Sequence, residues 1–274
     1  MKKATTYEQK QINEIAEWKA EEPGVISKAF GFVLEPMAWL VRKVVPEAAI
    51  RGALSASNAV AKFAADTNDV CRDGGVKSVD ELRTKDIELS DRLADEVHNW
   101  AIGLAVVEGA ATGYPGLLGM AVDIPVIITI ALRTIHKIGV CYGYEAKSEV
   151  DEKFVLGILA ASGANTMEEK VAAIVAMRQI EVILAKMTWK KMTEAAAKQQ
   201  LGKEAALLTI KALAKQLGIN ITKRKALTAI PFIGAAVGGS VNGWYIKEVG
   251  WAARRMYQER WLIENHKIID ADLA

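Results

Sequence analysis

The sequence has little cysteine and almost no excess of charge of either sign. Cys71 and Cys141 are the only cysteines in 274 residues, and their separation matches no metal or redox motif. We therefore expect two ordinary buried thiols in a reducing compartment. Lys and Arg number 35 against 33 Asp and Glu, a net charge of +2, which is too balanced to predict nucleic-acid binding.

Aromatic residues are also scarce, at 7%, although 51% of the residues are hydrophobic and the mean hydropathy is +0.12. A charged fraction of 25% argues against a polytopic membrane protein. No apolar segment follows Lys2 and Lys3, so no secretory signal is expected and a cytoplasmic location is predicted. Abundant Ala, Leu, Lys and Glu favour helices. We predict an all-α multi-helix bundle forming one domain over residues 1–274.

Hydrophobic spacing, proline and capping signals divide the chain into helices. An apolar stretch at 25–45 contains Pro36, which should kink it. The helix predicted at 87–107 carries Leu89, Leu93, Val97, Trp100 and Leu104 at spacings of three and four. Other helices are expected over residues 6–22, from Pro46 to about Cys71, from Pro125 to about 139–143, over 154–164, from Thr166 to about Gln200, over 203–217 and over 250–267.

Residues 108–126, EGAATGYPGLLGMAVDIPV, depart from regular helical patterning. Glycines this dense imply close backbone approach or special torsions. Glu108 and Asp123 bracket the segment, and Arg133 could pair with either carboxylate in a buried ion pair. The glycines concerned are Gly109, Gly113, Gly116 and Gly119.

A second apolar stretch, residues 226–246, contains no charge over 21 residues, about the length that crosses a bilayer. Pro231, Ser240 and Asn242 dilute its hydrophobicity. Three alternatives stay open: a permanent membrane span, a helix that inserts conditionally, and a core helix of a soluble domain. Its glycines, spaced for close helix packing, are Gly234, Gly238, Gly239 and Gly243.

Basic and aromatic residues flank this second stretch, an arrangement typical of a membrane interface and also of an ordinary helix-packing surface. The candidates for membrane-surface contact are Lys223, Arg224, Lys225, Lys247, Trp244 and Trp251.

We predict no metal and no cofactor. His98, His136 and His266 are far apart, and Asp95 with His98 alone makes a weak zinc signal. The segment GATGYPGLLG does not match a dinucleotide-binding loop. No nucleophile motif accompanies Glu108 and Asp123, so general acid-base chemistry at these carboxylates remains only an alternative.

Four strings, EGAATGYPGLLGMAVDIP, ALRTIHKIGVCYGY, TKRKALTAIPFIGAAVGGSVNGWYIKEVG and YQERWL, resemble the EcsC family. The resemblance extends from about Trp100 to Leu262, with residues 86–267 as the core of the domain and residues 1–85 matching less clearly. It implies a bacterial protein similar to the third product of an operon that encodes an ABC transporter. It implies no established activity and no catalytic residue.

These observations together predict a non-enzymatic accessory protein that associates with the inner membrane or binds a lipid or other hydrophobic ligand. An apolar pocket or releasable hairpin would take up acyl chains. The alternatives are a hydrolase or transferase that uses Glu108 or Asp123, and a regulator that docks on a transporter through residues 6–22 and 250–267. The residues predicted at the polar mouth of a ligand site are Glu108, Thr112, Asp123, Arg133, His136, Tyr142 and Tyr144.

Overall fold

The computed structural model describes residues 2–22, 60–61, 65–113, 117–164, 167, 170–175, 177 and 234–268. Helices and their connections make up these ranges, with no strand among them, so the predicted all-α class is confirmed. The elements are α1 (Thr6–Ala20), α4 (Asn68–Asp73), the 3₁₀ helix η1 (Val79–Thr84), α5 (Ile87–Gly113), α6 (Leu117–Cys141), α7 (Glu149–Ser162) and α10 (Gly234–Glu264).

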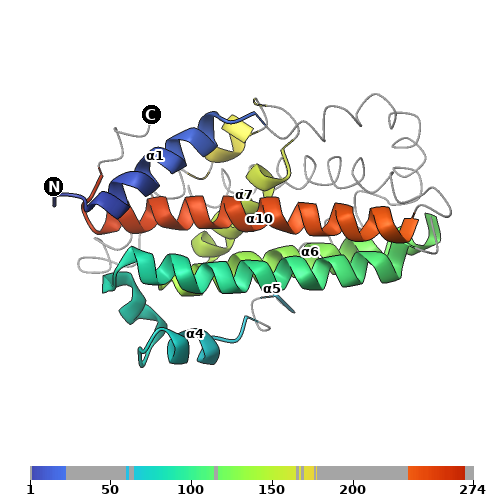
Figure 1. The fold of residues 1–274 in the computed structure, drawn as a ribbon, viewed down its shortest axis with the longest axis horizontal. Coiled ribbons are helices and arrows are strands. Elements are labelled where there is room, and N and C mark those ends of the chain that lie inside the picture. The colour runs from blue at the N-terminus through green and yellow to red at the C-terminus, as the bar shows by residue number, and fades with distance from the viewer. Residues whose placement is uncertain are drawn as a thin grey trace, which may run out of the picture.

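Three long helices, α5, α6 and α10, pack side by side (Figure 1). The chain runs along α5 in one direction, and α6 and α10 both return in the other. The most extensive contact is between α10 and α5, where Ala101 and Ala105 are buried on α5 and Ala252 and Ala253 on α10. Such small side chains let the two helix axes approach closely.

Glycines lie where the helices cross most tightly. A Cβ on Gly243 would be 2.5 Å from Val106 Cγ2, and one on Gly250 would be 2.1 Å from the His98 ring. Gly109 is buried within α5. Gly113 ends α5, Gly119 lies in α6, and α10 contains Gly234, Gly238 and Gly239, whereas Gly116 is outside the described residues.

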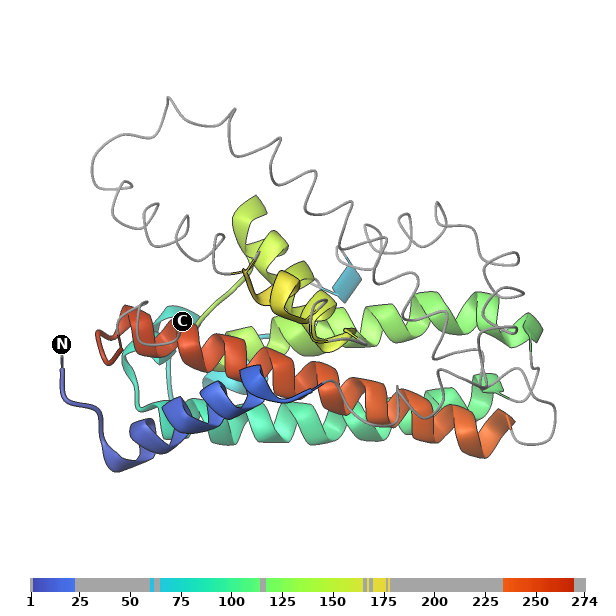
Figure 2. The same cartoon turned by 90° about the horizontal axis from the view of Figure 1, so that it is seen from above.

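The N-terminal helix α1 lies across α10, as Figures 1 and 2 show. It begins at a capping box, in which Glu8 N–H donates to Thr5 Oγ1 over 3.1 Å and Thr5 N–H to Glu8 Oε2 over 2.6 Å. Beyond its last turn, Lys170 Nζ donates to the carbonyl oxygens of Trp18 and Glu21. Side chains therefore form hydrogen bonds with backbone groups at both ends of α1, which fixes where the helix starts and stops.

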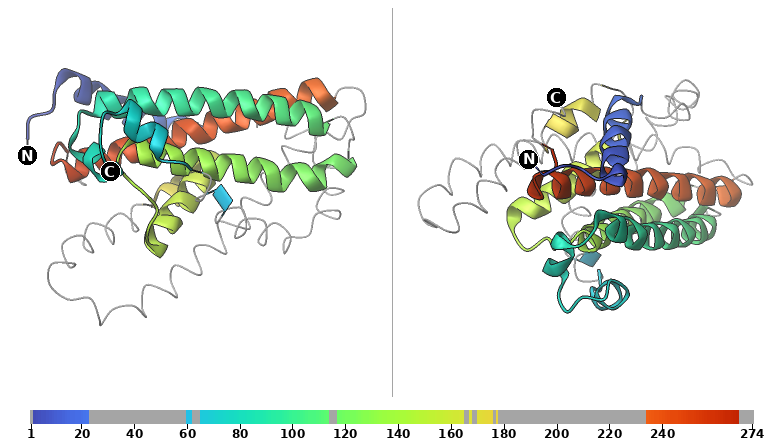
Figure 3. Two further views of the ribbon diagram at one scale, coloured as in Figure 1. Left: turned by 90° about the horizontal axis from the view of Figure 1, so that it is seen from below. Right: turned by 60° about the vertical axis from the view of Figure 1, so that its left-hand side comes forward.

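The polar start of α7 resembles that of α1. Ser148 Oγ accepts from Asp151 N–H over 3.2 Å, while the Asp151 carboxylate accepts from Ser148 N–H over 3.2 Å. This capping box starts the helix at Glu149, ahead of the Phe154 start predicted from the apolar pattern. In Figure 3, seen from below, α7 extends away from the three long helices.

Two sequence predictions about helix continuity are wrong. Residues 65–67 are not helical, so the helix predicted from Pro46 to about Cys71 is interrupted before α4. Segment 108–126, predicted to depart from ordinary helical patterning, is helical over 108–113, where α5 continues to Gly113, and over 117–126, which begins α6; residues 114–116 lie outside the described residues. Pro125 therefore lies inside α6, where packing against α5 and α10 outweighs its helix-breaking tendency.

Several predicted segments fall outside the described residues: 25–45, 203–217, most of 166–200 and the basic Lys223, Arg224 and Lys225. Of the uncharged run 226–246, the part from Gly234 onward belongs to α10, which continues without a break into the charged residues up to Glu264. In the part of the chain that the structure describes, no helix combines the length and the apolar character needed to cross a membrane.

Replacing Gly250 by alanine tests the α5–α10 crossing. The new methyl group would overlap the His98 ring, so we expect a loss of about 1–3 kcal/mol in the free energy of unfolding, measured by urea denaturation. Gly103→Ala on α5 is the matched control, since nothing lies within 4 Å of the position that its Cβ would take; it should stabilise the protein by up to about 1 kcal/mol. Equal effects of the two changes would contradict this account of the crossing.

Candidate functional site

Helix α5 contributes to two groups of polar residues. The first, the Asp91 network, is buried at its centre, and the second, the Arg133 cleft, is open to solvent. The network consists of Tyr7, Gln11, Glu14, Asp91, Asp95, Tyr142, Arg254, Arg255 and Gln258. The cleft is lined by Asp69, Val70, Asp73, Leu93, Glu96, Val97, Trp100, Ala101, Arg133, Thr134 and Lys137.

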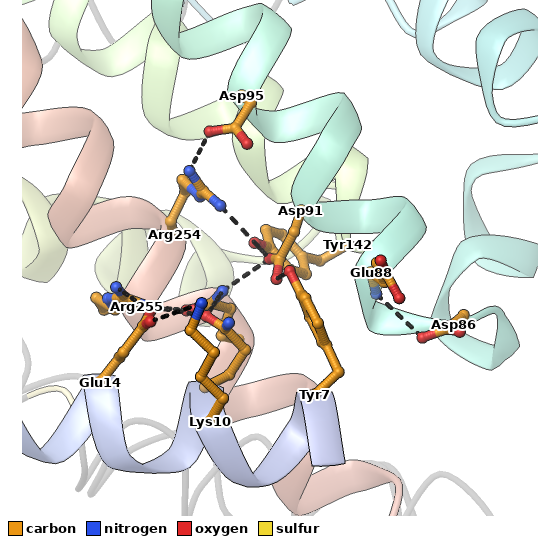
Figure 4. Close-up of polar contacts among 12 residues, drawn as sticks. Tyr7, Lys10, Glu14, Asp86, Glu88, Asp91, Asp95, Tyr142, Arg254 and Arg255 are labelled. Carbon is orange, nitrogen blue, oxygen red and sulfur yellow. Dashed lines mark hydrogen bonds and ion pairs between the residues drawn. The ribbon is translucent and has the colours of Figure 1, made fainter. Parts of the chain in front are cut away.

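Asp91 is the centre of the network, with only 2% of its surface exposed. Its carboxylate accepts hydrogen bonds from Tyr7 Oη at 2.7 Å, from Gln258 Nε2 at 2.7 Å and from Tyr142 Oη (Figure 4). Arg254 bridges the acids of two successive turns, because one guanidinium nitrogen lies 4.0 Å from Asp91 and another donates to Asp95. Asp91 thereby joins α1, α5, α10 and the end of α6.

A second layer of the network holds α1 against α10. Arg255 donates to Gln11 Oε1 at 2.9 Å and to Glu14 Oε2 at 2.7 Å, and Gln258 Nε2 lies 3.0 Å from the same Gln11 oxygen. Two ion pairs flank this layer, Lys19–Glu259 at 2.6 Å and Lys267–Glu8 at 2.9 Å. Polar contacts therefore carry much of the attachment of α1, alongside the buried Ile15.

Burial and the neighbouring Asp91 carboxylate raise the pKa of the Tyr7 and Tyr142 hydroxyls, so both stay protonated and donate. Tyr142 also stacks on Tyr257 at 6.3 Å between ring centroids, and Tyr144 stacks on the same ring at 5.8 Å. Arg260 lies 4.1 Å from the Tyr144 ring centroid. Tyr142 and Tyr144, predicted at a ligand mouth, are both in the core, where they join helices.

The Arg133 cleft has a volume of about 320 Å³ and lies between α4, α5 and α6. Arg133 Cζ is 4.7 Å from the Trp100 ring centroid, which is cation–π distance. Lys137, one turn further along α6, forms an ion pair with Asp69 of α4. The cleft therefore has basic groups on its α6 wall and acidic groups on its α4 and α5 walls.

An exposed apolar stripe on α5 begins at this cleft. Trp100, Leu104 and Val107, the α5 stripe, are spaced by four and three positions and lie on one helix face. Their exposed fractions are 55%, 37% and 69%. The periodicity that predicted an apolar face for this helix included Trp100 and Leu104, but the structure leaves both exposed. A contiguous patch of exposed apolar side chains is a candidate interaction surface.

The other predicted site residues do not converge on one place. Glu108 accepts a hydrogen bond from Asn242 Nδ2 at 2.6 Å, which links α5 to α10. His136 is buried in α6, and the side chains of Thr112 and Asp123 lie outside the described residues. Of the predicted mouth, only Arg133 lines the cleft that is described.

The predicted membrane-surface residues of α10 have varied surroundings. Lys247 is exposed and Trp244 half-buried. Trp251 is covered by Arg254 and Arg255, whose Cζ atoms lie 4.7 and 5.2 Å from its ring centroid, and by the edge of His98. His98 Nε2 donates to the Lys247 carbonyl at 3.0 Å, and burial lowers the pKa of this ring, which keeps it neutral.

Within the described ranges, no cluster of three or more His, Cys, Asp or Glu residues could hold a metal ion. Both cysteine thiols are free; Cys141 is buried as predicted, whereas Cys71 is half-buried, which corrects the prediction of two buried thiols. Burial raises the pKa of both thiols. They are therefore protonated at neutral pH and poor nucleophiles.

The described residues thus form a helical bundle with a largely buried ionic network and an open cleft between α4, α5 and α6. The model of the EcsC protein family matches residues 9–262. The chain belongs to the EcsC family, and the match includes residues before Trp100, where the sequence resemblance was less clear.

Among curated proteins, the chain is similar to the uncharacterized protein YdbA of Bacillus subtilis strain 168. The two are 22% identical over 199 residues, which cover 72% of this chain and 67% of YdbA. No solved structure matches the chain significantly.

Asp91→Asn tests the importance of the network. The change keeps the size of the side chain but removes the charge that faces Arg254 and weakens the acceptor for three donors. We expect unfolding free energy to fall by about 2–4 kcal/mol in chemical denaturation. Glu88→Gln, an exposed position on the same helix, should change it by less than about 0.5 kcal/mol. A similar small effect at both positions would show that the network contributes little.

The raised tyrosine pKa values predict loss of stability in alkali. A folded-state pKa above the unfolded value of about 10 gives stability that is fully present below that value and is lost as pH rises above it. Replacing Tyr142 by Phe removes one such group. The decline of unfolding free energy with pH, measured by urea denaturation, should become less steep by up to about 1.4 kcal/mol per pH unit. An unchanged slope would mean that Tyr142 ionises equally in both states.

Proposed function

We propose that this protein is a non-enzymatic accessory protein of the bacterial inner membrane that binds lipid through the α5 stripe and the adjoining Arg133 cleft. It would reside in the cytoplasm and associate with the membrane peripherally, without a permanent span. The observation that carries the proposal is the exposed run of Trp100, Leu104 and Val107 beside a basic residue.

The chemistry of this surface suits a lipid–water boundary. The α5 stripe offers apolar side chains to the acyl region, and the Trp100 ring, amphipathic and half exposed, suits the headgroup level. The guanidinium of Arg133, beside the Trp100 ring, would interact with the phosphate of a bound lipid. The family resemblance supplies the context of membrane transport or secretion.

The enzyme alternative receives less support. It relied on Glu108 or Asp123 as an acid or base. Glu108 accepts a hydrogen bond from Asn242 and is not among the described residues that line the cleft, and the side chain of Asp123 lies outside the described residues. A transporter regulator that docks through residues 6–22 and 250–267 is also less favoured, because α1 and α10 use much of their polar surface on one another.

Vesicle co-sedimentation tests the proposal. The protein should sediment with vesicles of phosphatidylethanolamine and phosphatidylglycerol. Val107→Asp puts a charge on the most exposed member of the α5 stripe, where it should leave the core intact and oppose insertion. We expect vesicle affinity to fall about ten-fold or more, the scale of losing one buried valine side chain.

Val175→Asp is the matched control, since Val175 is 49% exposed and does not belong to the α5 stripe. It should retain the affinity of the unmodified protein. Absence of sedimentation with any vesicle, or equal loss in both variants, would refute membrane binding through α5.

A further inference from the structure

The apolar face of α5 extends beyond its exposed part. Leu93, Val97, Trp100, Leu104 and Val107, together the α5 ridge, follow one another at spacings of four and three along one side of the helix. Exposure falls toward the start of the ridge, because Trp100 is exposed, Val97 is half-buried and Leu93 is only 5% exposed. The α5 stripe is therefore the uncovered part of a longer apolar surface.

The short helix α4, which lies outside the three long helices (Figure 1), sits on the covered end. A Cβ on Gly74, the C-cap of α4, would be 3.4 Å from Leu93 Cδ1. Of the six residues of α4, Val70 alone is buried, and it lines the same cleft as Leu93. Residues 65–67 are not helical, and Gly75 has a φ of 62°, so irregular backbone flanks α4 on both sides. A helix this short, with one buried side chain, is a unit that can open locally.

An ion pair ties α4 to α6. Lys137 Nζ of α6 donates to Asp69 Oδ2 of α4. The Lys137 side chain is only 11% exposed, whereas that of Asp69 is 40% exposed. An almost buried ammonium group needs a carboxylate, because leaving it without a partner is strongly unfavourable. Lys137 therefore holds α4 in place unless a second carboxylate can replace Asp69.

Glu96 of α5 is such a carboxylate. Helices α5 and α6 run in opposite directions, and Arg133 of α6 lies beside Trp100 of α5. One turn back along α5 is Glu96 and one turn further along α6 is Lys137, so these two residues lie at the same level of the cleft that both line. In the described ranges, no hydrogen bond or ion pair engages the Glu96 carboxylate. Lys137 thus has a carboxylate on α4, which it binds, and another on α5, which it does not.

We propose that α4 is a lid on the lipid-binding surface and that Lys137 is its latch, bound to Asp69 when the lid is closed and to Glu96 when it is open. Opening withdraws Val70 and uncovers Leu93, so the exposed apolar surface lengthens from about 10 Å to about 21 Å along α5. A surface of that length fits an acyl chain laid along the helix. This inference rests on the proposed function and adds how its surface is regulated.

The exchange of partners lets the lid open without leaving a buried charge unpaired. Lys137 keeps a carboxylate in both positions, so the cost of opening is mainly the exposure of Val70 and Leu93 to water. An acyl chain that covers Leu93 removes part of this cost and favours the open position. Lipid would therefore enlarge the surface to which it binds.

The native thiol of Cys71, which belongs to α4, reports on the lid. It is half-buried, whereas Cys141 is fully buried and serves as an internal reference for folding. The measurement is the rate at which N-ethylmaleimide labels Cys71 in the full chain, followed by mass spectrometry. Asp69→Asn removes the partner of the closed lid and should raise this rate about five-fold, and Glu96→Gln removes the partner of the open lid and should lower it about five-fold.

Charge alone would produce a different pattern. Burial, followed by the carboxylates of Glu145 and Asp69, raises the pKa of the Cys71 thiol. Removing a nearby carboxylate therefore yields more of the reactive thiolate and faster labelling. Glu145→Gln is the matched control, since Glu145 does not line the cleft, and it should speed labelling slightly. Slower labelling in Glu96→Gln cannot arise in this way.

A rate in Glu96→Gln that equals or exceeds that of the unmodified protein overturns the lid, as does an unchanged rate in Asp69→Asn. Glu96 is exposed, so its variant should fold, and an unlabelled Cys141 confirms this for each protein.

Vesicles of phosphatidylethanolamine and phosphatidylglycerol connect the lid to lipid. They should speed the labelling of Cys71, and Val107→Asp should cancel the increase while leaving the labelling rate without vesicles unchanged. Binding to vesicles with unchanged or slower labelling overturns the inference. If the protein binds no vesicle, the proposed function fails, and opposite effects of Asp69→Asn and Glu96→Gln in solution still support the lid.

Discussion

The Asp91 carboxylate is the constraint on which the arrangement of the described helices depends. It is almost fully buried, so its charge is tolerable only while its three donors and Arg254 surround it. Those partners come from α1, from the end of α6 and from α10. If any one of these elements shifts, a buried charge loses a partner, so the position of each helix depends on the others.

Local sequence signals predict the fold class and the ends of several helices correctly. Composition predicts an all-α protein. Hydrophobic periodicity, together with the glycine and proline residues that end helices, predicts α1, the start of α5 and the end of α6. The same signals fail where tertiary packing decides. Pro125 sits within α6 despite its missing donor, and residues 65–67 interrupt a segment whose composition favours a helix.

The candidate site was only partly predictable, for a related reason. Arg133 stood out as a charge within an apolar run. Glu96 and Trp100 did not, because hydrophobic spacing assigned Trp100 to a buried face and only the placement of the neighbouring helices shows that it is exposed. The Asp91 network was missed because Asp91 and Gln258 are 167 positions apart, and no local pattern connects them. Helix α5 thus holds the bundle together on one face and presents the cleft on another.

The contacts of α1 bear on the order in which the protein assembles during synthesis. Its polar partners Arg255, Gln258, Glu259 and Lys267 follow it by 240 to 259 positions. Helix α1 leaves the ribosome long before α10 exists, and closing so long a loop carries an entropic cost that only the finished bundle can offset. Helix α1 is therefore made early but docks late, and until then its amphipathic face is available to chaperones.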